Sequence, residues 1–187
     1  MPRWTIDAEK RLRDAAAELF EAHGYEAVTV TAIAEHAGVT RRTFFRYFAD
    51  KRDVLFPQTD EIGEAVAQAI NAQPVEADAA CLVREVIAVL VRAGTAITSD
   101  RPGQRRRQTL IESGPELRER SRTKLATTAA TIESALTARG DPSAQIIAAV
   151  AVDLLRTAYQ ATLEGDDAVL FADHLNQARK ALRIFDF

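Results

Sequence analysis

The segment from residue 29 to residue 51 constrains the fold more than any other part of the chain. It reads T-V-T-A-I-A-E-H-A-G-V-T-R-R-T-F-F-R-Y-F-A-D-K. Thr29 and Thr40 each stand where a hydroxyl can accept the unpaired backbone N–H groups that begin a helix. Gly38, between them, suits the left-handed conformation that often ends a helix. The segment therefore predicts two short helices joined by a tight turn.

The second of these helices is predicted to have one apolar side and one basic side. Phe44 and Phe48 are four residues apart, so they share the side that packs inward. The other side collects arginine, threonine and aromatic residues, and residues 38–52 hold five Lys or Arg against one Asp. A short basic helix held by a preceding helix is typical of a helix-turn-helix reader of the DNA major groove.

The stretch A-G-V-T-R-R-T-F-F-R-Y-F-A-D-K-R-D-V-L, within a pattern that begins at Leu12, resembles the DNA-binding domain of TetR-type transcriptional regulators. The resemblance implies an all-α protein with a three-helix DNA-binding domain at residues 1–50 and a helical regulatory and dimerisation domain at residues 51–187. It further implies a dimeric, ligand-responsive regulator, most simply a repressor. Such a regulator binds a pseudo-palindromic operator with one reading helix in each half-site.

The resemblance also implies which side chains contact DNA. The arginines can donate to guanine or to phosphate, and which of them reads bases stays open; Thr43 can reach a base edge or a thymine methyl group. Two positions depart from many relatives, because Arg42 replaces a Gly and Phe45 replaces a Tyr, which removes one expected hydrogen bond to phosphate. The full set comprises Thr29, Thr40, Arg41, Arg42, Thr43, Phe45, Arg46, Tyr47 and Lys51.

Charge is distributed unevenly along the 187 residues. Residues 1–56 contain nine Lys or Arg and nine Asp or Glu, whereas the remainder contains 15 and 18. The positive charge is therefore concentrated at one helix, and the larger part of the chain is mildly acidic, as expected if only the first part meets phosphate.

The remaining chain is predicted to be helical, since alanine is abundant and there are only six Pro and eight Gly. We expect Asp50 and Asp141 to begin helices as N-caps, Pro142 to be the first helical residue after Asp141, and Pro57 to kink or split the helix that contains it. The predicted helices cover residues 5–23, 51–72, 79–98, 104–112, 115–139, 143–164 and 168–185.

The helix predicted at residues 143–164 is apolar around most of its circumference. Its polar residues Asp153, Arg156, Thr157 and Gln160 are spaced so that they share one narrow face. Such a helix needs a second partner besides its own core. We therefore expect a homodimer in which the last two helices of each chain form a four-helix bundle.

A small-molecule effector site between the central helices is implied by the resemblance. For each candidate side chain, Cys81 above all, a place in the core is the simpler interpretation. In addition, R-R-Q-T-L-I-E-S-G-P-E-L-R-E-R and R-R-T-F-F-R-Y-F are similar to actinobacterial regulators of the mycofactocin-type group, some of which respond to acyl-thioesters. The candidates are Phe56, Cys81, Arg84, Arg107, Leu110, Ile111, Asp153 and Tyr159.

No feature of the sequence indicates an enzyme, a cofactor or a metal site. His23, His36 and His174 lack metal-ligand spacing, and no glycine-rich phosphate loop is present. One cysteine permits no intramolecular disulfide and, with no apolar signal segment or uninterrupted membrane span, favours a cytoplasmic protein. The alternative hypothesis is a helical interaction protein whose basic helix binds an acidic partner instead of DNA.

Overall fold

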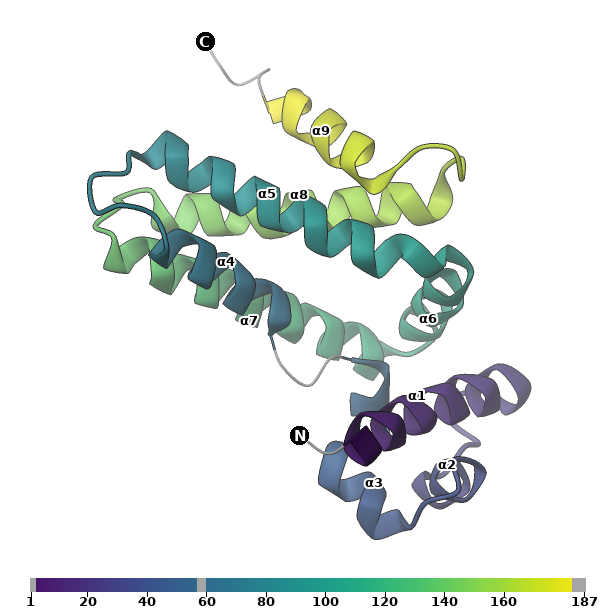
Figure 1. Cartoon of the computed structure of the whole chain (residues 1–187). Helices are drawn as coiled ribbons and strands as arrows, with labels where there is room; N and C mark the ends of the chain where they lie inside the picture. Colours follow the sequence, from purple (N-terminus) through teal and green to yellow (C-terminus); the bar gives the residue numbers. More distant parts are fainter. Residues whose placement is uncertain (1–2, 57–59, 183–187) are drawn as a thin grey trace. The chain divides into compact units, whose positions relative to one another are not determined.

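The computed structural model describes residues 3–56 and 60–182, with side chains from Ala8 onward, and contains no β-strand within these ranges. The predicted all-helical class is confirmed (Figure 1). Its α-helices are α1 (Arg3–His23), α2 (Val30–His36), α3 (Arg41–Tyr47), α4 (Glu61–Asn71), α5 (Ala79–Ile97), α6 (Arg101–Ser113), α7 (Pro115–Ala138), α8 (Ala144–Glu164) and α9 (Phe171–Ala181). Two 3-10 turns, η1 (Asp53–Leu55) and η2 (Thr98–Asp100), complete the set of described elements.

The chain forms two compact units, which we name the head and the body. The head comprises residues 1–59 and 106–121, and the body comprises residues 60–105 and 122–187. The unit boundaries fall inside α6 and α7, so each of these helices contributes to both units. The functional division at residue 50 stays a prediction, whereas packing extends the head to residue 59 and adds a second segment.

The core of the head is built around aromatic side chains. Phe20, Phe44, Phe48 and Phe56 are fully buried there. Residues 106–121 complete the same cluster with two apolar side chains, Ile111 at 2% exposure and Leu117 at 0%. The three N-terminal helices therefore do not enclose their core alone.

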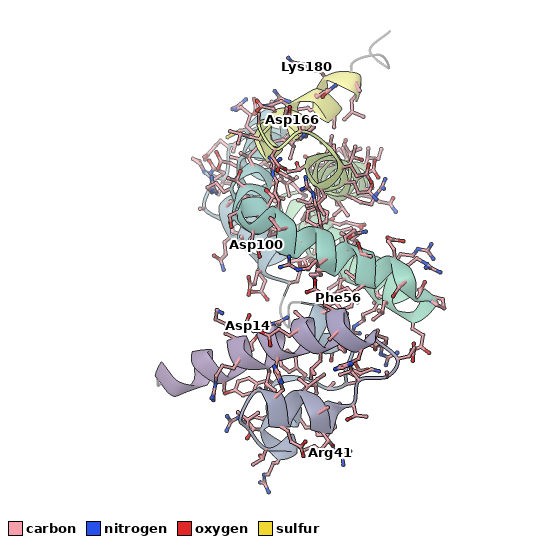
Figure 2. All side chains as sticks on the ribbon, turned by 90° about the vertical axis from the view of Figure 1, so that its right-hand side faces the viewer. Asp14, Arg41, Phe56, Asp100, Asp166 and Lys180 are labelled. Atoms are coloured by element: carbon pink, nitrogen blue, oxygen red, sulfur yellow. The ribbon has the colours of Figure 1, made fainter. Side chains whose placement is uncertain are left out.

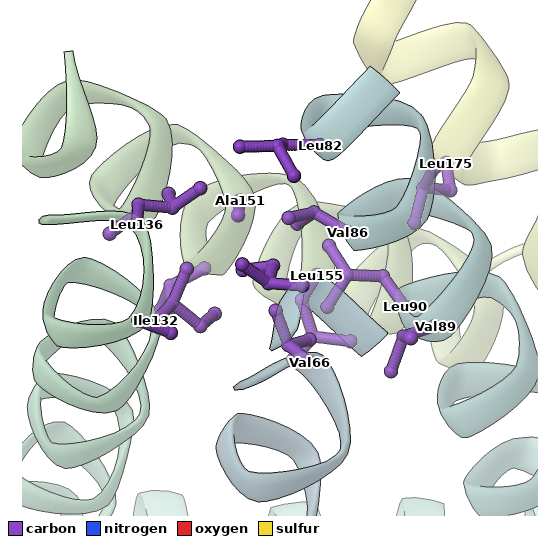
Figure 3. Packing of buried hydrophobic residues seen from close by; sticks show 14 of the residues in the cluster. Val66, Leu82, Val86, Val89, Leu90, Ile132, Leu136, Ala151, Leu155 and Leu175 are labelled. Carbon is purple, nitrogen blue, oxygen red and sulfur yellow. The ribbon is translucent and has the colours of Figure 1, made fainter. Parts of the chain in front are cut away.

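The core of the body is built mainly from aliphatic side chains. Figure 3 shows Val66 of α4, Leu90 of α5, Ile132 of α7 and Leu155 of α8 converging in one cluster. Helix α9 adds Leu175 and Phe171 to this cluster. These helices are long, so many modest contacts add up to a continuous apolar core.

Helix α8 is the one helix in the described ranges that is long and apolar enough to cross a bilayer. Core helices pass the same test of length and composition. Ala148, Leu155 and Ala158 on α8 are buried in the body core, so its apolar character has an explanation in packing.

The predicted helix over residues 51–72 is wrong as a single helix. Asp50 accepts the backbone N–H groups of Arg52 at 2.8 Å and Asp53 at 3.1 Å, and only the 3-10 turn η1 follows. A new helix, α4, then starts with Asp60 as N-cap, whose carboxylate accepts the N–H of Gly63. Pro57, the residue expected to kink or split the helix, lies outside the described residues.

Several other helix boundaries differ from the prediction, most of them by one to three residues. Helix α6 begins at Arg101 instead of residue 104. Asp100 accepts the N–H of Gly103, and Pro102 is tolerated because it lies in the first helical turn. The carboxylate of Asp141 accepts the N–H of Ser143 in a local turn, so α8 begins only at Ala144. Helix α9 covers Phe171–Ala181 and so begins three residues later than predicted, while residues 183–185 of the predicted helix lie outside the described residues.

Candidate DNA-binding surface

The turn between α2 and α3 is fixed by backbone geometry. Gly38 adopts a φ of +66°, which an L side chain rarely adopts. The N–H of Gly38 donates to the carbonyl of Glu35 at 3.0 Å. The N–H of Val39 donates to the carbonyl of Ala34 at 2.9 Å. The predicted turn is confirmed, and it ends α2 so that α3 can start three residues later.

Both predicted threonine caps are present. Thr29 accepts the N–H of Ala32 at 3.1 Å, and Thr40 accepts the N–H of Thr43 at 3.1 Å. The hydroxyl of Thr43 also lies 3.0 Å from that of Thr40. One proton of the Thr40–Thr43 pair is used between the two hydroxyls, whereas the hydroxyl of Thr29 accepts from the backbone and keeps its own proton to donate outward.

Helix α3 has the two predicted sides. Phe44 and Phe48 are 0% and 1% exposed, and the guanidinium of Arg13 on α1 lies 5.1 Å from the Phe48 ring centroid. Figure 2 shows Arg41 projecting from the head, well separated from Asp14 of α1. The outward set consists of exposed Arg41, Arg42, Phe45 and Arg46 with half-buried Thr43 and Tyr47.

The basic side of α3 is partly organised by stacking. Phe45 is 46% exposed, rests edge-on against Phe44 with centroids 5.5 Å apart, and has the guanidinium of Arg41 at 5.3 Å from its centroid. Arg46 lies 4.8 Å from the Tyr47 centroid and donates to the Tyr47 hydroxyl at 2.9 Å. No bond or ion pair to another described residue involves Arg42. The surface thus presents two stacked cations and one unrestrained cation.

Lys51 has a structural contact that the sequence did not indicate. Its ammonium donates to the carbonyl of Tyr25 at 2.7 Å and lies 4.1 Å from the centroid of that ring. An ammonium has three N–H donors, so capacity remains for another acceptor. The predicted phosphate contact of Lys51 stays a prediction, while its hold on the loop before α2 is observed.

Two ionisable groups beside Lys51 are perturbed. Burial, followed by the charge of Asp50, raises the pKa of Tyr25 to about 12. Burial of Asp50 disfavours its charge, but hydrogen bonds from the side chain of Arg52 and from the backbone outweigh that effect and lower the pKa of this carboxyl. Tyr25 therefore stays neutral and Asp50 stays charged at neutral pH.

The segment that follows α3, residues 49–56, is held by arginines that sequence reasoning missed. Arg13 donates to the carbonyls of Val54 at 2.8 Å and Phe56 at 3.1 Å. Arg107 donates to the carbonyl of Leu55 at 2.6 Å, and Arg120 donates to the carboxylate of Asp53 at 2.5 Å. These contacts join positions that are 41 to 67 residues apart in sequence, and no local pattern marks them.

Four of the predicted effector residues belong to the head. Phe56 and Ile111 are each 2% exposed, Leu110 packs against the same cluster, and the guanidinium of Arg107 lies 5.5 Å from the Phe56 centroid. The structure brings these four together as core and core-facing residues of one unit.

The other four predicted effector residues belong to the body and are not gathered at one point. Cys81 is half-buried, not the core residue expected, and Arg84 is exposed. Asp153 is exposed on α8 and pairs with Arg156 at 2.6 Å. Tyr159 donates to Gln104 at 2.9 Å. A role in effector binding stays a prediction for all eight residues.

Metal binding has no candidate cluster in the described ranges. Within residues 3–56 and 60–182, no group of three or more His, Cys, Asp or Glu side chains could hold an ion.

Comparison with known proteins identifies the first part of the chain. Residues 12–56 match the family described as bacterial regulatory proteins, tetR family. The chain is 48% identical over 59 residues to the HTH-type transcriptional regulator TcmR of Streptomyces glaucescens, covering 32% of this chain and 26% of TcmR. It is 51% identical over 43 residues to MftR of Mycobacterium tuberculosis, a protein named for regulation of mycofactocin biosynthesis, covering 23% of this chain and 22% of MftR.

These sequence matches span about a quarter of each relative. The full fold is matched by the solved structure of a SmeT–triclosan complex, with a TM-score of 0.64, 17% identity, and coverage of 93% of this chain and 90% of that chain. At that identity the match establishes the fold alone. The predicted resemblance is thus confirmed, and the family is one of regulatory proteins.

Proposed function

We propose that this chain, which carries the DNA-binding domain of the TetR family, is a dimeric, ligand-responsive transcriptional regulator that represses its target genes. The observation that carries the proposal is the two-sided α3, whose apolar side is locked into an aromatic core while its basic side is exposed. A rigid basic helix of this kind fits the major groove. Since its target is DNA, we place the protein in the cytoplasm.

The three arginines of α3 differ in their proposed roles. Arg42 and Arg46 lie four residues apart, on the side of the helix away from Phe44, where side chains reach base edges. The stack of Arg41 on Phe45 presents a cation and an apolar ring together, which suits a phosphate beside a thymine methyl group. Thr29, Thr40, Tyr47 and Lys51 provide further phosphate contacts, and Thr43 provides one to a base edge.

We propose a homodimer because the body leaves apolar side chains uncovered. Ile146 on α8 is 68% exposed, and Leu182, which follows α9, is 40% exposed. The exposed ion pair of Asp153 with Arg156 lies on α8 as well and could fix register between two copies. Sedimentation should show a dimer at micromolar concentration, and a monomer there would contradict the proposal.

An effector is proposed from the comparison, since SmeT was solved with triclosan. A ligand that binds one conformation of the dimer better than another shifts the population and changes operator affinity. A thermal-shift screen of small apolar molecules tests this. A ligand at 100 times its Kd should add about 2.7 kcal/mol to stability.

The decisive experiment is binding to DNA from the gene's own promoter region. We expect salt-dependent binding to one pseudo-palindromic fragment that exceeds binding to a scrambled fragment by at least about 10³-fold. Equal binding to both fragments, or none, would defeat the proposal. The family match favours DNA over the acidic partner of the alternative hypothesis.

A further inference from the structure

Asp53 lies between the end of α3 and a residue of α7, and it bonds to both. Its side chain is 8% exposed. One carboxylate oxygen accepts the backbone N–H of Ala49 at 3.2 Å, and the other accepts from the guanidinium of Arg120 at 2.5 Å. All three residues belong to the head.

Ala49 is the first residue after Phe48, which is the C-cap of the reading helix and donates to the carbonyl of Phe44 at 2.9 Å. The backbone of Phe48 is extended, with φ −134° and ψ 132°, so the chain leaves the helix at this point. A hydrogen bond to the N–H of Ala49 therefore fixes the place and direction of that exit.

A buried carboxylate is costly unless it is paired and hydrogen-bonded. Arg120 supplies the opposite charge that offsets the burial of the Asp53 carboxylate beside Ala49. Arg13 and Arg107 bind carbonyls of residues 54–56, and Arg52 donates to the carboxylate of Asp50. Asp53 thus connects the guanidinium of Arg120 to the backbone N–H of Ala49 through two hydrogen bonds.

We infer that Asp53 and Arg120 form a positioning pair that sets the orientation of the reading helix. The inference rests on the proposed DNA-binding function, and it assigns a role to residues that do not themselves contact DNA. Arg120 holds Asp53 in place, and Asp53 holds the chain at the end of α3. Operator affinity should depend on this pair although neither side chain lies on α3.

The test compares wild type, Arg120→Met and the double variant Asp53→Asn/Arg120→Met at a temperature where each is fully folded. Arg120→Met leaves the Asp53 carboxylate buried without its cation, so both thermal stability and operator affinity should fall. We expect operator Kd to rise about tenfold, comparable to losing one base contact. In the double variant the unpaired charge is gone, so the thermal midpoint should recover while operator Kd stays raised.

A matched control uses the neighbouring ion pair of Arg52 with Glu116, whose atoms are 3.7 Å apart and whose Glu116 side chain is 73% exposed. Glu116→Gln also removes a charge pair between the segment after α3 and α7. Because an exposed pair contributes little, operator Kd should stay within about twofold of wild type. A tenfold effect of this control would show that any charge there matters and would overturn the inference.

Hydrogen exchange at the amide of Ala49 tests the pair without DNA. Exchange should accelerate in Arg120→Met and in the double variant and stay unchanged in Glu116→Gln. Unchanged Ala49 exchange in Arg120→Met, or operator affinity that recovers together with stability in the double variant, would overturn the inference. If the wild type binds no operator, the proposed function fails, whereas the exchange result still decides whether the pair positions the helix end.

Discussion

The head and the body solve the same problem, enclosing a helical core, with different side chains. The head relies on four fully buried phenylalanines and on guanidinium groups bound to backbone carbonyls. The body relies on valine, leucine, isoleucine and alanine, with Phe171 as the one aromatic residue among its fully enclosed core members. Seven-residue helices such as α2 and α3 are marginal alone, so each needs large side chains to fix it.

This difference affects how much can be predicted from the sequence of each unit. Large aromatic side chains, caps and a turn glycine at fixed spacing make the head chemically specific, and its family match lies there. Aliphatic packing in the body can be satisfied by many sequences. The sequence of the head therefore carries the family match, whereas the sequence of the body gives little indication of what the body binds.

The largest expected effect is a difference in stability between substitutions on the two sides of α3. Phe44→Ala should destabilise the head by about 3–5 kcal/mol, because it empties a fully buried aromatic site. Phe45→Ala, one residue on, should cost about 1 kcal/mol or less yet weaken operator binding. Urea denaturation and operator titration of both variants measure this contrast, and similar stability losses would contradict the two-sided helix.

The core of the body should be sensitive to added side-chain volume. A Cβ at Gly94 of α5 would meet the buried ring of Phe171 at 2.1 Å, so something must shift. Alanine gains about 1 kcal/mol over glycine in a helix, but overpacking costs about 1–3 kcal/mol. We expect a net loss of about 1 kcal/mol for Gly94→Ala by denaturation, against no change for the exposed neighbour Thr95→Ala. A more stable Gly94→Ala would show that α9 moves away freely.

Charge should matter in the head and not in the body. Arg46→Ala should weaken operator binding, and the slope of log K against log salt should flatten by about one unit if Arg46 meets a phosphate. Lost preference at one base pair would instead mark a base contact. Arg92→Ala, an exposed arginine on α5, removes the same charge and should leave both quantities unchanged. If Arg46→Ala also left operator affinity and the salt slope unchanged, Arg46 would have no part in DNA binding.

The smallest expected effect is an alkaline one, in the head alone. Because the pKa of Tyr25 rises to about 12 on folding, the folded state favours its neutral form. The resulting stabilisation is complete below about pH 10, the usual tyrosine pKa, and is lost as pH rises toward 12. Tyr25→Phe should remove a phenol that titrates near pH 12 from an absorbance titration and remove this part of the alkaline stability loss. Titration of Tyr25 near pH 10 would contradict its burial.

Local chemistry in the sequence predicted local structure well. Thr29, Gly38 and Thr40 set the two helix starts and the turn, and the spacing of Phe44 and Phe48 identified the inward side of α3. Each of these features depends on neighbours within four residues. Their spacing alone was enough to place them.

Long-range contacts and competing turns were not predictable in the same way. Nothing near Lys51 indicates that Tyr25 accepts its hydrogen bond, and nothing near Asp53 indicates Arg120, 67 residues later. Asp50 and Asp141 accept backbone N–H groups, but the prediction that they are helix N-caps is wrong. They close short local turns, and a single sequence does not show whether such a turn continues into a helix.

The two-segment make-up of the head bears on how the protein is synthesised. When residue 59 has left the ribosome, the three N-terminal helices still lack Ile111 and Leu117, which fill the same core. The head cannot complete its packing until residue 121 has also emerged. Although the proposed DNA-binding residues are among the first to be made, the surface that carries them is finished only after all of the body's α4 and α5 has been translated.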